Sequence, residues 1–158
     1  MATTPSTTGA VRAKEFHFPV SVEWIGGRKT LARVDGKPCI EIAPPPEFRG
    51  TDPDVWSPED FFVAAAASCF AVTFTGLAQR EGLRVERLTV DGDGIAGKRP
   101  DGAFGFTGVE LRIVLELDPA AHDLARKLAK TAEQTCLVTV SLDVPVEMTI
   151  ELRTPPAA

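Results

Sequence analysis

The first part of the chain alternates apolar and polar residues, the pattern of half-buried β-strands. In residues 16–23 the apolar side chains fall on every second position, and 29–34 repeats the pattern after a Gly-Gly turn, which predicts a hairpin. A third short strand is expected over 39–43. The proline-rich segment 44–56 then predicts a loop long enough to suggest a function.

Two helices are predicted, and the first is apolar on nearly every side. It begins after Ser57, a good N-cap followed by proline and two acidic residues, and runs over 58–81 to Gly82. Small residues fill its centre and aromatic residues surround them, so we expect it to be buried on nearly every side. After Pro119, a second helix is predicted over 120 to about 136, with a narrow apolar stripe.

Alternation returns after the first helix and predicts further strands. Residues 83–92 indicate one strand, 105–117 can pair with it as a long hairpin, and 144–152 forms the last strand. Strands, a long helix, strands, a second helix and a strand are typical of an α+β fold, here an antiparallel β-sheet packed on two principal helices. We expect a single domain over 14–154, preceded by a flexible N-terminal tail at 1–13.

Charge and hydropathy narrow the class of function. The 158 residues include 22 acidic and 17 basic side chains, for a formal net charge of −5. This balance argues against nucleic acid as a partner, which needs a basic surface, and against an anionic membrane. We expect no apolar stretch to reach the roughly 18 residues of a membrane span, and the polar N-terminus lacks the apolar region of a secretory signal. The expected location is therefore the cytoplasm.

Three other kinds of site are weakly indicated. Residues 92–98 have the spacing of a phosphate-binding loop, but Arg99 follows where Ser or Thr would hold Mg²⁺, so a hairpin tip is the better interpretation. The histidines and cysteines lack the spacing of a zinc site. Ser68 lies mid-helix without a nucleophile elbow. Nucleotide, metal and serine-hydrolase chemistry are therefore disfavoured.

The cysteines carry the most specific pattern. There are three, widely spaced, which is not a secreted disulfide framework. Cys69 lies in the middle of the first predicted helix and Cys136 ends the second, so packing of the two helices brings the thiols together. Such a pair can reduce a peroxide, because one thiolate becomes a sulfenic acid and the other thiol condenses with it to a disulfide. An external dithiol then resets the pair.

A structural role is the alternative for any cysteine, because the residue is frequently buried as a small apolar side chain. We assign that role to Cys39, in a short predicted strand. A reactive thiolate also needs a nearby positive charge, since burial alone raises the pKa of a thiol. Arg28, on a turn, is the candidate, and a solvated hairpin arginine is the alternative.

Aromatic residues of the first helix supply apolar surface that could favour bulky organic peroxides over hydrogen peroxide. Plain core packing is the alternative for each of them. They are Phe61, Phe62, Phe70 and Phe74.

These residues resemble a known family. The segment Ser-Pro-Glu-Asp-Phe-Phe-Val-Ala-Ala-Ala-Ala-Ser-Cys-Phe at 57–70 resembles the central helix of the OsmC/Ohr family of organic hydroperoxide reductases. Residues 132–136 and 143–147 resemble that family's second cysteine and final strand, and the Gly-Gly-Arg turn at 26–28 resembles its early glycine-arginine turn. The resemblance covers about 20–152. It implies an OsmC-like intertwined homodimer that reduces organic hydroperoxides with a lipoyl-type dithiol and no cofactor.

The resemblance also implies roles for individual residues. Cys69 would attack the peroxide, Cys136 would resolve the sulfenic acid, Arg28 would stabilise the thiolate and Glu59 would orient that arginine. Leu137 stands where the family commonly has proline, and the sequence does not distinguish between the Ohr and the OsmC branch. The alternative function is a non-catalytic redox-sensing or small-ligand-binding protein on the same scaffold, because a sensor would also use both cysteines.

The position of Glu59 suggests how the site is assembled. Glu59 and Cys69 are ten residues apart on one predicted helix, which is about 15 Å along its axis and farther than a glutamate side chain reaches. No glycine or proline lies between Pro58 and Gly76 to break the helix. We therefore expect two composite sites per dimer, each with both cysteines from one chain and Glu59, with or without Arg28, from the other.

Overall fold

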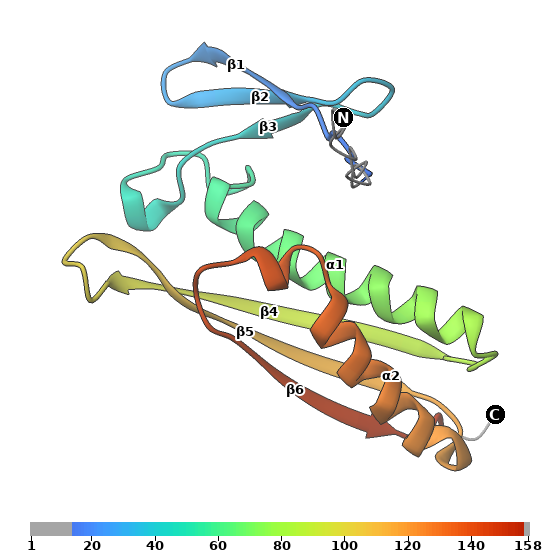
Figure 1. Ribbon diagram of the computed structural model, residues 1–158. Helices are drawn as coiled ribbons and strands as arrows, with labels where there is room; N and C mark the ends of the chain where they lie inside the picture. The colour runs from blue at the N-terminus through green and yellow to red at the C-terminus, as the bar shows by residue number, and fades with distance from the viewer. Residues whose placement is uncertain (1–13, 157–158) are drawn as a thin grey trace, which may run out of the picture.

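The computed structural model describes residues 14–156, so the tail predicted over 1–13 lies outside the described residues. Eight principal helices and strands follow one another in the predicted order (Figure 1). They are β1 Ser21–Gly26, β2 Lys29–Arg33, β3 Ile40–Ile42, α1 Pro58–Arg80, β4 Arg87–Lys98, β5 Phe104–Glu116, α2 His122–Thr135 and β6 Val146–Arg153. Short 3₁₀ turns lie at Pro46–Phe48, Pro119–Ala121 and Thr139–Ser141.

The strands form two three-stranded sheets, which we call sheet A (β1-β2-β3) and sheet B (β4-β5-β6). In sheet A both pairs are antiparallel. In sheet B, β4 and β5 form the predicted long antiparallel hairpin, whereas β6 pairs with β5 in parallel. The parallel pair follows from the connection, because α2 lies between β5 and β6 and returns the chain to the same end of the sheet. The predicted α+β class with two principal helices is confirmed, but the sheet that packs on the helices is mixed and not wholly antiparallel as expected.

The core lies between sheet B and both helices, which cover the same face of that sheet (Figure 1). The alternation predicted for β5 is confirmed, since Leu111, Ile113 and Leu115 on its inner face are at most 1 % exposed. Each fully buried side chain of this kind contributes about 1.5–3 kcal/mol. Against them pack Phe70 and Phe74 of α1, both 0 % exposed, and the small residues of α2.

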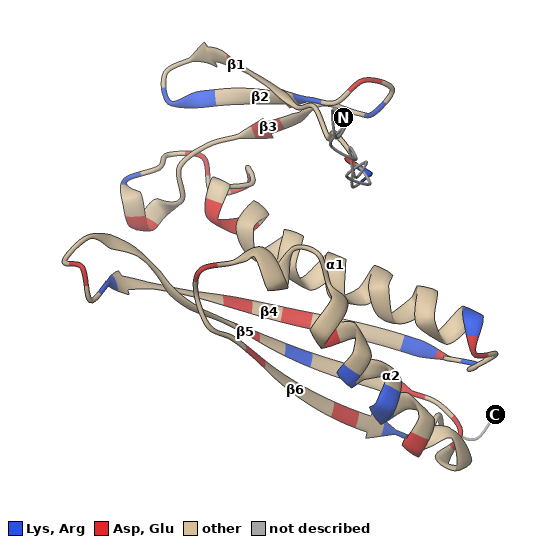
Figure 2. Cartoon of the chain, in the orientation of Figure 1, with Lys and Arg blue, Asp and Glu red and all other residues tan. Residues whose placement is uncertain are grey.

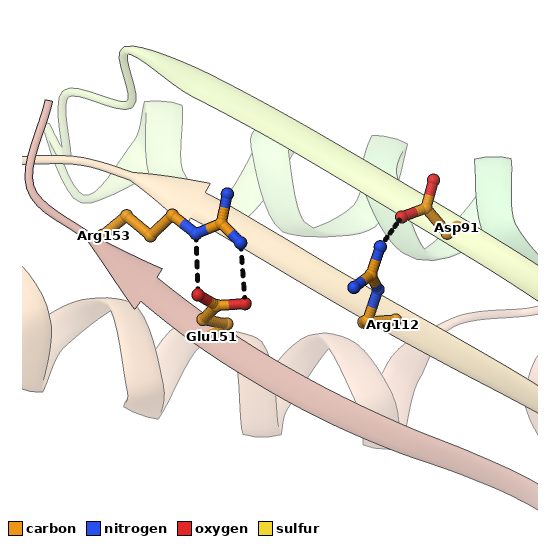
Figure 3. A network of polar contacts seen from close by, with 4 residues as sticks. All are labelled: Asp91, Arg112, Glu151 and Arg153. Atoms are coloured by element: carbon orange, nitrogen blue, oxygen red, sulfur yellow. Dashed lines mark hydrogen bonds and ion pairs between the residues drawn. The ribbon is translucent and has the colours of Figure 1, made fainter. Parts of the chain in front are cut away.

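Charged residues recur along the strands of sheet B (Figure 2), and on β5 the exposed Glu110 and Arg112 alternate with the buried inner residues, so they lie on the opposite face. Asp91 on β4 faces Arg112 on β5, and their side chains are paired at 2.9 Å; Glu151 and Arg153 form a second ion pair on β6 (Figure 3). These side chains are about half exposed, so their pairing adds little to stability. These charged side chains make the outer face of sheet B polar, so that it remains exposed to solvent.

Helix α1 is unbroken from Pro58 to Arg80, as predicted. A capping box starts it: the Ser57 hydroxyl accepts the Asp60 N–H at 3.0 Å, and the Asp60 carboxylate accepts the Ser57 N–H at 2.7 Å. Between its first and last turns the helix carries no charge (Figure 2). An 18-residue window of it has a mean hydropathy of 1.9 and is only 22 % buried. Our expectation that no stretch is apolar enough to span a membrane was therefore wrong for α1, by length and composition.

The glycine-rich segment 92–98 is strand, not the hairpin tip that we predicted, because β4 continues to Lys98. Its glycines make room for α1. An added Cβ at Gly92 would lie 2.7 Å from a methyl carbon of Val63, and one at Gly94 would lie 2.5 Å from the other methyl carbon of that residue. The glycines that resemble a phosphate loop therefore serve the packing of α1 on β4.

Sheet A lies beyond the N-terminal end of α1, and within residues 14–156 no helix covers it (Figure 1). The predicted first strand begins later than expected, at Ser21, and residues 14–20 have no regular secondary structure. The apolar side chains predicted to share one face there are exposed: Phe16 68 %, Phe18 79 %, Val20 61 %, Val22 60 % and Trp24 70 %. Sheet A thus has an apolar face without a second layer in the described chain.

Candidate functional site

The structure brings Cys69 and Cys136 together, as predicted. Cys69 lies at mid-length in α1, and Cys136 caps the C-terminus of α2, where its N–H donates to the Ala132 carbonyl at 2.8 Å. The two thiols are close enough that each shifts the pKa of the other. The N–H of Val138, in the turn after Cys136, lies 3.5 Å from the Cys69 sulfur. The packing of α1 against α2 and the following turn therefore makes a dithiol pair.

The two thiols have different environments. Burial raises the pKa of Cys69, and the neighbouring Cys136 raises it further, against hydrogen bonds from the Val138 N–H and the Thr73 hydroxyl. Burial also opposes ionisation of Cys136, but hydrogen bonds from Thr139, from Cys69 and from backbone N–H groups outweigh it and lower the pKa. Within a single chain, Cys136 is therefore the more acidic thiol of the pair.

Two threonines at the site were missed by sequence reasoning. Thr73 lies four residues after Cys69 on α1, and its hydroxyl reaches the thiol. Thr139 lies three residues after Cys136 at the start of a 3₁₀ turn, is 7 % exposed and donates to the Cys136 carbonyl at 3.3 Å. The i,i+4 spacing of Thr73 was a usable signal. Thr139 offered only its nearness in sequence to Cys136.

Arg28 does not serve Cys69 within one chain. It is exposed at the turn between β1 and β2, and its Nη1 donates to the carbonyls of Phe48 at 2.9 Å and Arg49 at 3.4 Å. Among the described residues, the groups that shift the pKa of Cys69 include no arginine. Arg28 therefore holds the 44–50 segment to sheet A. That segment is tight at Gly50, where an added Cβ would lie 1.8 Å from the Pro44 carbonyl oxygen.

Glu59 lies in the first turn of α1, and the unbroken helix separates it from Cys69. Its Oε2 is buried and has no hydrogen-bond partner among the described residues. Glu59 borders an open groove with a volume of about 1330 Å³, which runs along the small residues of α1 between the 45–57 loop and the β4-β5 hairpin. A buried carboxylate oxygen without a hydrogen-bond donor is costly, and the described residues supply no donor to this one.

The four phenylalanines divide into two groups. Phe70 and Phe74 are fully buried in the core, so for them the core-packing alternative holds. Phe62 stacks on Phe106 with ring centroids 4.2 Å apart, and Phe61 packs on Trp56 with ring centroids 5.2 Å apart. Phe61 and Phe62 are both half-buried. None of the four borders the groove, whose aromatic lining is Phe48, Trp56, Phe104 and Phe106.

Cys39 is exposed and precedes β3, and its sulfur accepts a hydrogen bond from Arg33 Nη1 at 3.1 Å. It is therefore not the buried apolar residue that a structural role implies. In residues 14–156, no group of three or more His, Cys, Asp or Glu side chains could hold a metal ion.

Comparison with known proteins places the chain in a family. The chain is 29 % identical over 142 residues to the uncharacterized protein YmaD of Bacillus subtilis (strain 168), which covers 87 % of this chain and 93 % of that protein. An OsmC-like protein of unknown function from Vibrio cholerae has a TM-score of 0.77 at 24 % identity, covering 87 % of this chain and 100 % of that one. An organic hydroperoxide resistance protein from Elizabethkingia anophelis has a TM-score of 0.74 at 21 % identity, covering 90 % and 100 %.

At these identities the solved structures establish the fold alone. The family itself follows from the sequence, because the family model described as OsmC-like protein matches residues 51–151. This segment contains both thiols of the pair, the capping box of α1 and all of sheet B except the last residues of β6. Since it is more than half of the chain, the protein belongs to the OsmC-like family.

Proposed function

We propose that the protein is a cytoplasmic, cysteine-based peroxidase that reduces organic hydroperoxides and is reset by a small dithiol of the lipoyl type. The observation that carries this proposal is the contact between the Cys69 and Cys136 thiols, which join the centre of α1 to the end of α2. The packing of α1 against α2 does not by itself require two ionisable thiols to be in contact. The name of the Elizabethkingia anophelis protein, an organic hydroperoxide resistance protein, supports the substrate class.

The proposed cycle has three steps. The Cys69 thiolate attacks the O–O bond of the hydroperoxide; its sulfur becomes a sulfenic acid, and the alkoxide leaves and takes up a proton to form an alcohol. The Cys136 thiolate then attacks the sulfenic sulfur, forming a disulfide and releasing the oxygen as water after protonation. Finally the dithiol reduces the disulfide by two thiol exchanges and becomes a disulfide itself.

The first step needs a positive charge that the described residues of a single chain do not bring to Cys69, whose pKa is raised by burial. We propose that a second copy of the chain supplies it. Within residues 14–156, three features support this homodimer: Glu59 Oε2 has no hydrogen-bond partner, the apolar surface of α1 is mostly uncovered, and so is the apolar face of sheet A. In the proposed dimer, Glu59 orients the partner's Arg28, or its own, beside a Cys69 thiol, and the cation favours the thiolate.

Arg28 is able to take this role without leaving the loop. Both of its hydrogen bonds are made by Nη1, so the rest of the guanidinium fork stays available to a carboxylate or a thiolate.

Steady-state consumption of tert-butyl hydroperoxide tests the function. The wild type, Cys69→Ser and Cys136→Ser are compared, with dihydrolipoamide and the thioredoxin system offered separately. Cys39→Ser is the matched control, because that thiol is exposed and lies outside the pair. We expect turnover by the wild type and Cys39→Ser with dihydrolipoamide, and none by Cys69→Ser. A single stoichiometric oxidation of the wild type without turnover would establish the alternative, a redox sensor.

A further inference from the structure

One backbone donor at the end of α2 points at Cys69. In a continuing helix the N–H of Val138 would bond to the carbonyl of Gln134, four residues earlier. Cys136, with φ −65° and ψ 110°, leaves the helical conformation instead, and the chain turns toward α1. The N–H of Val138 then donates to the Cys69 sulfur at 3.5 Å. No carbonyl of residues 14–156 competes for this proton, so it is directed at the thiol.

The turn that carries this donor is fixed by its own hydrogen bonds. The Val140 N–H donates to the Cys136 carbonyl at 3.1 Å, and the Ser141 N–H donates to the Val138 carbonyl at 3.0 Å. The Ser141 hydroxyl donates to the Leu137 carbonyl at 2.7 Å. These bonds hold the Val138 peptide in place whether or not the thiol is charged, and a donor fixed in advance stabilises a charge without reorganisation.

The charge on the Cys69 sulfur changes during the proposed cycle. The sulfur is a thiolate when it attacks the hydroperoxide, and it becomes a thiolate again when it leaves the mixed disulfide with the reductant. Cys69 is half-buried, so water solvates this charge only in part. A hydrogen bond to an ionised acceptor is about twice as strong as one to a neutral acceptor. The Val138 N–H therefore favours the thiolate over the thiol and over the sulfur of a disulfide.

We propose that the Val138 N–H is a catalytic group that stabilises the Cys69 thiolate, both as it attacks the hydroperoxide and as it leaves the mixed disulfide. This inference rests on the proposed function. In the attack, the S–O bond forms while the O–O bond breaks, and the alkoxide takes the electron pair and then a proton. In the release, the second thiolate of the reductant bonds to the reductant's own sulfur in the mixed disulfide. The S–S bond to Cys69 breaks, its electron pair returns to the Cys69 sulfur, and the dithiol is oxidised by two electrons.

The test removes this single N–H by replacing Val138 with the corresponding α-hydroxy acid, which turns the peptide link to Leu137 into an ester. Cell-free translation with an acylated suppressor transfer RNA supplies the residue. The matched control is the same replacement at Val140, whose N–H donates to the Cys136 carbonyl and to no sulfur. An ester also weakens the Leu137 carbonyl as an acceptor, so Ser141→Ala, which removes the hydroxyl donor to that carbonyl, is the second control.

All variants are made in a Cys39→Ser, Cys136→Ala background, in which Cys69 is the sole thiol. The background also removes Cys136, the titratable side chain that acts on Cys69 within the described chain. Exchange of the Cys69 thiol with 4,4′-dithiodipyridine is followed by stopped flow across neutral and alkaline pH.

We expect the Val138 ester to react roughly three- to tenfold more slowly at neutral pH. Losing a hydrogen bond to a charge lowers the thiolate fraction about 10- to 100-fold, and the greater nucleophilicity of the remaining thiolate recovers about half of that on a logarithmic scale. The deficit should shrink as the pH rises and the thiolate forms in both proteins, whereas a structural defect would slow the reaction at every pH.

The two controls should follow the pH profile of the background protein. An unchanged rate in the Val138 ester overturns the inference, as does a deficit that is equal at every pH or is shared by the Val140 ester. If the Val138 ester does not fold, Val138→Pro replaces it, because the φ of −70° at that position suits the proline ring and proline has no N–H.

The probe is a disulfide, so the result does not depend on peroxide chemistry, and peroxide consumption by the wild type is measured separately. Peroxide turnover with a Val138-independent pH profile overturns only the role of this N–H. A Val138-dependent profile without peroxide turnover overturns only the peroxidase.

Discussion

The backbone N–H of Val138 lies 3.5 Å from the sulfur of Cys69, although 69 residues separate them in sequence. This donor belongs to the turn that follows Cys136, so one short segment contacts both thiols. Because the donor is a backbone group, the contact does not depend on the side chain at position 138. The turn after α2 therefore contributes to the acidity of both thiols.

The first prediction concerns ionisation of the pair. In the wild type, Cys136 raises the pKa of Cys69, and Cys69 lowers that of Cys136 by donating a hydrogen bond. We expect Cys136→Ala to lower the pKa of Cys69 and Cys69→Ala to raise that of Cys136. The measurement is the pH dependence of iodoacetamide labelling at each cysteine, resolved by mass spectrometry in a Cys39→Ser background.

The free energy of unfolding should depend on pH in the direction that the lowered pKa of Cys136 requires. The lowered pKa of Cys136 means that its thiolate stabilises the fold above the ordinary thiol pKa of 9.0, and that this contribution is lost as the pH falls through the lowered value. A Cys69 titration that is unchanged in Cys136→Ala would contradict the coupling.

The second prediction tests the composite site. Neither Cys69→Ser nor Glu59→Gln alone should sustain peroxide turnover, but their mixture should recover it after subunit exchange. In a mixed dimer with shared sites, one site carries both defects and the other carries none. Random exchange at equal concentrations then restores about a quarter of the wild-type rate for a two-fold dimer. If exchange is verified with tagged subunits and activity stays absent, each site lies within one chain.

The third prediction concerns the packing of α1 on β4. Gly94→Ala places a Cβ 2.5 Å from Val63 and 2.7 Å from the Phe106 ring, and we expect it to lower the free energy of unfolding by about 1–3 kcal/mol. Gly97→Ala in the same strand is the control, because its Cβ meets nothing closer than 3.8 Å. Urea denaturation measures both. Val63→Ala should recover part of the loss in Gly94→Ala; a loss of equal size in both glycine variants would point to strand propensity instead.

The fourth prediction concerns a row of carboxylates across the outer face of sheet B. Asp93, Glu110 and Glu147 are register neighbours on three adjacent strands. Like charges directly opposite one another destabilise a sheet, so Glu110→Gln should raise the free energy of unfolding by about 0.2–1 kcal/mol. The matched variant is Glu116→Gln, whose register neighbours Arg87 and Arg153 are basic, and it should have the opposite sign. Both effects should shrink at 1 M salt, and equal effects would exclude charge as their cause.

Much of this structure could be predicted from local signals. The capping residues and the uncharged run predict α1, and the alternation of apolar and polar residues predicts β5. The placement of one cysteine on each helix predicts the contact between the two cysteines. The first strand begins later than predicted because the alternating residues 16–20 have no neighbouring strand to pair with in the described chain. The extension of β4 was missed because glycine is a turn signal in a sequence, and only the proximity of Val63 shows why glycine is needed in that strand.

The sequence predicts that Cys69 and Cys136 form the candidate site, but it does not predict which of the two thiols has the lower pKa. The order of the two pKa values depends on Val138 and Thr139, whose positions come from a turn that no periodic pattern predicts. Likewise, the distance of Glu59 from Cys69 follows from helix geometry, whereas the burial of its Oε2 depends on tertiary packing.

The exposed aromatic side chains of the chain give it an internal optical probe. The protein has two tryptophans and no tyrosine, so its ultraviolet emission comes from Trp24 and Trp56 alone. Trp24 is 70 % exposed in sheet A, and Trp56 is 52 % exposed beside the groove. Both indoles lie on surfaces that the proposed second copy would cover. Their emission should therefore move to shorter wavelength as the concentration rises through the dissociation constant, and dilution would release it again without any label.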